Sequence, residues 1–324
     1  MINLKIIIRF TLVIGLFFSG SSIYAASCCG GGAAGALILP KFSRVMVEGS
    51  FQYEKYNGFY GSDRAYYEDP PASDLNQIRL KAAIALRVSD RFQMALSVPY
   101  VWNKNYYSGM NLNSSGMGDS IVSATYETFD DVKCVYKVRT LQDLMPAIYI
   151  SLVNTIPTGI SPYSNVDNSF KITGRGFYQT LISTLIDKTV YPYNFSINGG
   201  YGVHYGRPVN REYGVYKKPY EKKLGNRWNL GASAGYTLFM ENMDLVTLVV
   251  SYDYINEAGA RIDGVVDHLA DFYKSSIGIS LSYTTSDKNR IFKIGYTANP
   301  SYAEWGSNSP VTSIISAGVS NVFK

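Results

Sequence analysis

The strongest constraint on the fold of this chain is an alternation of apolar and polar side chains that continues through segments of about 12–14 residues. Such alternation places successive side chains on opposite faces of a β-strand. A tilted strand needs roughly 9–11 residues to cross a bilayer, whereas strands in soluble proteins have about 5–6 residues. The length of these segments therefore predicts the strands of a membrane-spanning β-barrel, with one face toward lipid and the other toward the lumen.

Residues 193–205 show this pattern clearly, with Tyr193 and Phe195 on one face and Asn194 and Ser196 on the other. Aromatic residues lie near the ends of the segment and aliphatic or small residues lie between them, which is typical of a lipid-facing strand. The predicted strands are residues 44–56, 76–88, 91–103, 118–129, 146–158, 175–187, 193–206, 226–239, 244–257, 272–285, 290–301 and 312–323. Twelve is an even number, as in bacterial single-chain barrels.

Short and long connections alternate between these segments. Tight turns are predicted at 89–90, 187–188, 241–242 and 287–289, and long polar loops at 57–75, 104–117, 159–174, 207–225, 258–271 and 302–311. Residues 130–145 depart from this rule and are expected to form a short amphipathic helix. The layout predicts an all-β, transmembrane, antiparallel up-and-down barrel of the Gram-negative outer membrane, with extracellular loops and periplasmic termini.

The first 25 residues have the pattern of a cleaved secretory signal peptide. Lys5 and Arg9 make the start basic, residues 10–18 are almost wholly apolar, and Ala25 precedes the expected cleavage point. The apolar stretch is shorter than the roughly 20 residues of a membrane-spanning helix. Residues 26–43 are rich in Gly and Ala and are predicted to be a flexible segment, so that the barrel comprises residues 44–324.

Composition and charge agree with this assignment. The chain has 28 tyrosines and 29 glycines, while charged residues make up only 17%, which suits a barrel with aromatic girdles. A net charge of +5 without a long Lys/Arg cluster gives no reason to expect a nucleic-acid partner. The expected partners are membrane lipid, lipopolysaccharide, a small-molecule solute and, because the last strand ends near Phe323, the barrel-assembly machinery.

Three cysteines allow three interpretations. Cys28 is a candidate for lipid attachment, although no aliphatic residue precedes it at the usual position. Cys28 or Cys29 can alternatively form a disulfide or a thiolate metal site with Cys134. In the third interpretation, the segment is a tether or an interaction tail. Any pairing leaves one of the three thiols over.

Charged residues within the predicted strands are expected to face the lumen. A Lys or Arg on the lipid face costs roughly 2–4 kcal/mol at the bilayer midplane. The candidates for lumen contacts and selectivity are Glu48, Arg79, Lys81, Arg87, Glu127, His204, Arg227, Asp253, Lys274 and Lys293. Two interpretations follow: an open lumen with a mild preference for anions, or a salt-bridged interior without a pore.

No motif indicates catalysis, a cofactor or a metal. Residues 30–35 match the dinucleotide pattern G-x-G-x-x-G, but they follow no predicted strand. The two histidines, His204 and His268, lie in the lumen and in a loop, so neither is placed for lipase chemistry on the outer wall. We therefore expect neither an enzyme nor a cofactor.

Three short motifs occur in order at strand ends: SVPY at 97–100, GMGDS at 116–120 and IPTG at 156–159. Over about residues 75–160 the chain resembles the outer-membrane family of the MetA pathway of phenol degradation, which carries these motifs. The motif residues with expected structural roles are Pro99, Tyr100, Gly116, Gly118, Asp119, Pro157, Thr158 and Gly159. Proline is tolerated where strand pairing stops, and aspartate can accept free backbone N–H groups at a corner.

The pattern and the resemblance together predict an outer-membrane channel for passive diffusion of small solutes, aromatic or anionic in character. The alternative is a non-conducting barrel with a structural or interaction role in the envelope. In that role, tyrosine-rich loops bind a partner or the barrel forms part of a larger complex.

Overall fold

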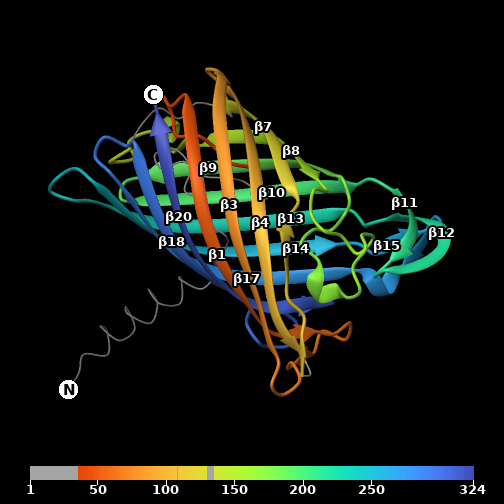
Figure 1. Ribbon diagram of the computed structural model, residues 1–324. Helices are drawn as coiled ribbons and strands as arrows, with labels where there is room; N and C mark the ends of the chain where they lie inside the picture. The colour runs from red at the N-terminus through yellow and green to blue at the C-terminus, as the bar shows by residue number, and fades with distance from the viewer. Residues whose placement is uncertain (1–35, 108, 130–134) are drawn as a thin grey trace, which may run out of the picture.

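The computed structural model describes residues 36–107, 109–129 and 135–324. Twelve antiparallel strands pair in chain order around the wall, and β1 pairs with β20 to close the barrel (Figure 1). The wall strands are β1 (Val45–Tyr60), β3 (Asp74–Ser89), β4 (Phe92–Tyr107), β7 (Ser120–Phe129), β8 (Ala147–Ile156), β9 (Gln179–Val190), β10 (Tyr193–His204), β13 (Arg227–Phe239), β14 (Leu245–Glu257), β17 (Phe272–Thr284), β18 (Arg290–Ala298) and β20 (Ser309–Phe323).

The predicted fold is confirmed strand by strand, with strand ends within about four residues of the predicted ones. β1, β3 and β4 have 16 residues each and are the longest strands. In Figure 1 these three cross the strands of the far wall steeply, as the tilted strands of a closed barrel do. No helix in the described part of the chain is long and apolar enough to cross a membrane.

The outer face of the barrel is apolar around its circumference. Exposed apolar side chains occur on strands of every part of the wall, including Phe51 on β1, Ile84 on β3, Ile182 on β9, Leu230 on β13 and Ile279 on β17. In water such a continuous exposed belt would be unfavourable, whereas lipid chains can solvate it. The inner face carries many Ser, Thr and Asn residues and the charged strand residues, together with apolar patches such as the one around Met46 and Ile291.

The two ends of the barrel differ. The turn end comprises the short connections 90–91, 191–192, 240–244 and 285–289, together with Val45 and Phe323, where the first and last wall strands meet. The loop end comprises the long connections 61–73, 108–119, 157–178, 205–226, 258–271 and 299–308. The predicted alternation of short and long connections is therefore present.

Two of the long loops contain strands that the sequence analysis missed. β11 (Arg207–Glu212), β12 (Val215–Lys223), β15 (Ala260–Ile262) and β16 (Val265–Asp267) form a separate four-stranded sheet at the loop end (Figure 1). Tyr213-Gly214 and Asp263-Gly264 turn these hairpins with positive φ at both residues. An Asp-Gly pair between apolar residues is a recognised hairpin signal, so the second hairpin could have been predicted.

Residues 130–145 differ from the expected amphipathic helix. Residues 130–134 lie outside the described residues, Val135 is buried and forms an isolated bridge with Val190, and the helical part of residues 135–145 is a 3₁₀ turn, η1 (Leu141–Leu144). None of the residues of η1 is buried, and Leu141 is among the most exposed apolar residues of the chain. Without an apolar face to bury, η1 has no packing that would extend it into a longer helix.

The three family-like motifs meet in one corner at the loop end. The Gly118 N–H donates to Pro99 O (2.8 Å), and the Thr158 hydroxyl donates to Gly118 O (2.6 Å). Asp119 accepts from the Gly159 N–H (3.1 Å) and from the Arg175 N–H (2.7 Å). A Cβ on Gly159 would lie 2.7 Å from Gly174 Cα, so only glycine fits here.

The motif residues of this corner share one structural role, because together they anchor the loop 157–178. Burial raises the Asp119 pKa, while the Arg175 and Gly159 N–H groups favour its ionised form. The remaining motif residues lie nearby. Tyr100 is on the outer face, Pro157 directly follows β8, and Gly116 faces Ile160 of the loop.

Candidate functional site: the lumen and its mouth

The central part of the lumen carries two ion pairs between neighbouring strands. Arg79 of β3 contacts Glu54 of β1 (2.5 Å), and Lys81 of β3 contacts Glu48 of β1 (3.2 Å). Both carboxylates are buried, so each needs the cation beside it. For these residues the structure agrees with the salt-bridged interpretation rather than with a row of free cations.

The described part of the N-terminal segment lies inside the barrel at the turn end. Leu37 and Leu39 pack with Met46, Ala83 and Ile291 of the wall. Their neighbours pack on another part of the wall, Ala36 against Val153 and Leu181, and Ile38 against Tyr149 and Leu185. Successive residues of this short segment thus pack alternately against two different parts of the wall.

Polar contacts hold this segment in place. The Leu39 N–H donates to Gln93 Oε1 (2.8 Å), and Lys41 forms an ion pair with Glu127 (3.2 Å). Arg87 donates to the carbonyl oxygens of Ser43 (2.9 Å) and Pro40 (3.2 Å). The sequence analysis predicted a flexible segment, whereas Ala36–Leu39 are buried. These residues are buried because the short apolar run ALIL within the Gly/Ala-rich stretch packs against an apolar patch of the inner wall.

A second group of charges lies toward the loop end. Arg175, from the loop 157–178, donates to both carboxylate oxygens of Glu257 on β14 (2.7 and 2.5 Å). The hydrogen bonds and charge of Glu257 outweigh the burial of Arg175 and raise the Arg175 pKa further. Arg227, the cross-strand neighbour of Glu257, is held by Asn229 Oδ1 (2.9 Å) and has no ion pair among the described residues. Of the two arginines, Arg175 is therefore the one that forms the ion pair with Glu257.

The other predicted lumen residues also lie on the inner face. His204 donates from Nδ1 to Gly225 O (2.7 Å), and its Nε2 lies 3.0 Å from Gln179 Nε2. Lys274 donates to Thr312 Oγ1 (3.0 Å). Asp253 on β14 and Lys293 on β18 follow the inward alternation of their strands. Most of the ten candidates thus belong to the wall pairs, to the contacts of the N-terminal segment or to the loop-end group, while Asp253 and Lys293 are placed by strand alternation alone.

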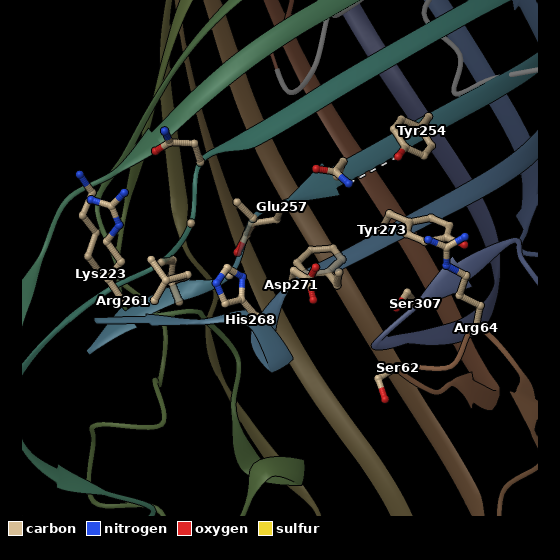
Figure 2. Close-up of a pocket in the computed structure, with 18 residues that line it drawn as sticks. Ser62, Arg64, Lys223, Tyr254, Glu257, Arg261, His268, Asp271, Tyr273 and Ser307 are labelled. Carbon is tan, nitrogen blue, oxygen red and sulfur yellow. Dashed lines mark hydrogen bonds between the residues drawn. The ribbon is translucent and has the colours of Figure 1, made fainter. Parts of the chain in front are cut away.

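A cavity of about 700 Å³ opens at the loop end (Figure 2). Figure 2 shows Lys223 and Arg261 on one side of it and Arg64 with Tyr273 on the other. Its aromatic wall comprises Tyr254, Phe272 and Tyr273, and its acidic residues are Glu257 and Asp271. Glu257 links the cavity to the Arg175–Arg227 group below it.

Sequence reasoning missed most of this mouth. Arg64, Arg175 and Arg261 lie in or beside loops, where the period-two pattern gives no facing. Arg175 was moreover predicted as the start of a strand, which actually begins at Gln179. The clusters of Lys and Arg in 207–225 were the available signal, but they do not show which of these cations reach a cavity.

No group of His, Cys, Asp and Glu residues that could hold a metal ion occurs in the described part of the chain. Cys28, Cys29 and Cys134 lie outside the described residues, as does the predicted signal peptide. The three interpretations of the cysteines therefore stay predictions.

Comparison with known proteins supports the fold. No family model and no curated protein matches this chain. Among solved structures, an outer membrane channel from Pseudomonas putida F1 is similar, with a TM-score of 0.65 and 10% identity over 88% of this chain and 97% of that chain. The beta domain of the Bordetella autotransporter BrkA matches with a TM-score of 0.49 (10% identity; 87% and 100% covered), and the NanC porin with 0.41 (13%; 86% and 99%).

At this level of identity, the first of these likenesses establishes the fold and no more. The chain has the fold of a twelve-stranded outer-membrane β-barrel. The resemblance to the family of the MetA pathway has no matching model behind it and stays a prediction.

Proposed function

We propose that this protein is an outer-membrane channel for passive diffusion of small solutes, aromatic or anionic in character. The observation that carries the proposal is a closed barrel with an apolar belt outside, an inner face that holds the charged strand residues, and an open cavity at one end. A solute would enter at the cavity, pass the Arg175–Arg227 group and move along the paired charges of β1 and β3. No residue arrangement of the described chain suggests a chemical step.

The proposed orientation places the loop end outside the cell and the turn end in the periplasm of a Gram-negative bacterium. Lipid and lipopolysaccharide would contact the outer belt, and the barrel-assembly machinery would act during insertion. Labelling of an engineered cysteine in the 61–73 loop, in a background without the three native cysteines, tests the orientation. Reaction with an impermeant reagent on intact cells is expected for the loop and not for a cysteine in the 285–289 turn.

The second candidate function is a non-conducting barrel with a structural or interaction role. The observation in its favour is the segment Ala36–Ser43, which occupies the lumen at the turn end. A segment at this place would obstruct a solute path, so the two candidates differ in a measurable property, the conductance of the barrel.

Single-channel conductance of the refolded protein in a planar bilayer, with a salt gradient, tests the channel. Steady conductance with a preference for anions is expected, because Arg227 and the mouth cations have no ion pair among the described residues. Uptake of small solutes by proteoliposomes provides an independent measurement. A verified folded barrel that neither conducts nor takes up solutes would replace the channel with the structural role.

A further inference from the structure

The cations at the mouth are arranged in an unfavourable way. Lys223 of β12 and Arg261 of β15 are direct cross-strand partners, and both line the cavity. Like charges directly opposite each other on neighbouring strands destabilise a sheet. Neither side chain has an ion pair among the described residues, although Glu221 and Asp263 lie on the same two hairpins. The fold thus holds two positive charges together, facing a cavity, without a carboxylate from the chain.

The opposite side of the cavity adds a third cation and an aromatic surface. The Arg64 guanidinium lies over the Tyr273 ring, 5.6 Å from its centroid, and forms no ion pair among the described residues. Stacking of this kind uses the face of the guanidinium and leaves its N–H groups available to an acceptor. Tyr254 and Tyr273 lie 6.1 Å apart with their rings inclined by 35°, and Phe272 lies beside them in the lining.

The acidic residues of the lining do not cancel these charges. Glu257 is already neutralised by the bidentate contact with Arg175. Asp271 is the one further carboxylate in the lining, against Arg64, Lys223 and Arg261. The cavity therefore has an excess of positive charge beside a flat apolar wall, and its volume of about 700 Å³ is within the range of small-molecule sites.

We propose that this cavity is a binding site for small aromatic carboxylates: Lys223 and Arg261 hold the carboxylate, Tyr254, Phe272 and Tyr273 on the opposite side contact the ring, and Arg64 adds positive charge beside that aromatic wall. The proposal rests on the channel function, for which the site would be the point of capture at the entrance. An anion bridging Lys223 and Arg261 relieves their mutual repulsion, so the preference for anions follows from the fold itself.

Binding of benzoate to the folded full-length protein in detergent, measured by isothermal titration calorimetry at low salt, tests the site. Benzoate is expected to bind, its neutral isostere benzamide is not, and the affinity is expected to fall as salt is raised. K223Q/R261Q should lower the benzoate affinity about tenfold or more. The matched control K217Q/K218Q removes two exposed cations of β12 outside the cavity and should leave binding unchanged.

Further variants separate the parts of the proposal. R64Q lies outside the small sheet and provides the charge test if K223Q/R261Q fails to fold. F272L should lower the affinity for benzoate about threefold. Acetate, which lacks a ring, should be bound weakly by both F272L and the unmodified protein. Equal binding of benzamide and benzoate, or unchanged binding by R64Q and K223Q/R261Q, would overturn the site. Acetate binding as tight as benzoate would overturn the role of the aromatic wall.

Different experimental results would disprove the proposed channel and the proposed binding site. A barrel that conducts but binds no benzoate disproves the site and leaves the channel. A barrel that binds benzoate in a manner that depends on Lys223, yet does not conduct, keeps the site and disproves the channel.

Discussion

The two ends of the barrel differ in how fully their charged side chains are paired, because the loop end has ion pairs such as Arg175–Glu257 but also cations without a carboxylate partner. At the turn end and in the middle, the carboxylates of Glu48, Glu54 and Glu127 each have a cation within 3.2 Å, and the buried residues Ala36–Leu39 pack against the inner wall. At the loop end, Lys223 and Arg261 oppose each other without a carboxylate beside them. Buried ion pairs stabilise one conformation of the protein. Cations that lack a carboxylate partner and line an open cavity instead favour the binding of an anionic ligand. If the proposed site exists, the residues that obstruct the lumen and the residues that bind the solute are located at opposite ends.

The largest expected effect comes from displacing the N-terminal segment from the inner wall at the turn end. L37D/L39D places carboxylates against the apolar patch formed by Met46 and Ala83, so the N-terminal segment should leave the wall. Single-channel conductance is then expected to rise several-fold, as the lumen opens. L141D/L144D, on the exposed turn η1, is the matched control and should conduct like the unmodified protein. Unchanged conductance in L37D/L39D would show that the segment does not limit the path.

The next effect concerns the paired charges of the middle. E48Q/E54Q removes the partners of Lys81 and Arg79 and leaves two cations in the lumen without these carboxylates. The permeability ratio of anions over cations, read from the reversal potential in a salt gradient, should increase several-fold. E241Q, in an exposed turn, changes the net charge without touching the lumen and should leave the ratio as it was. A ratio that stays constant in E48Q/E54Q would mean that ions do not pass these strands.

A smaller effect is expected at the junction between the two regions. R175Q leaves the buried Glu257 carboxylate without its bidentate partner. The free energy of unfolding in detergent should fall by about 1–3 kcal/mol, reduced from a fully buried pair because Arg175 is partly exposed. Restoring neutrality in R175Q/E257Q should recover part of this loss. If R175Q were as stable as the unmodified protein, the ion pair would have no structural role.

The smallest effect is a pH dependence at the turn end. The Asp244 carboxylate accepts hydrogen bonds from the Tyr283 hydroxyl, the Ser286 N–H and Asn242, and these hold its pKa below the usual 3.8. A lowered folded-state pKa stabilises the protein above the unfolded pKa, and this contribution is lost as the pH falls. The thermal midpoint should therefore decline below about pH 4, and D244N should decline less over the same range.

Much of the barrel could be predicted because the facing of a residue depends on the sequence pattern of its own strand. One face of every strand must be apolar, so period-two alternation reveals strands such as Tyr193–His204 and their facing. The facing of Arg79 and Lys81 follows from the same rule. Their pairing with Glu54 and Glu48 does not, because it depends on the register between β1 and β3, which alternation leaves open.

The mouth and the packing of the N-terminal segment could not be predicted for a different reason. Arg175 reaches Glu257 only because Asp119 fixes the loop 157–178 from a corner made of three distant motifs. Lys223 and Arg261 oppose each other only because two separate hairpins pair. Such contacts join segments that are far apart in the sequence, so the periodicity within either segment cannot predict them.

The seam between β1 and β20 has a consequence for assembly. It pairs Val45 with Phe323, and every residue between them lies inside the loop that this pairing closes. Until this seam forms, the wall is an open sheet with two unpaired edges, and such edges can pair with other chains. The seam is also the wall contact with the greatest sequence separation, so its closure carries the largest loop-closure entropy of the barrel.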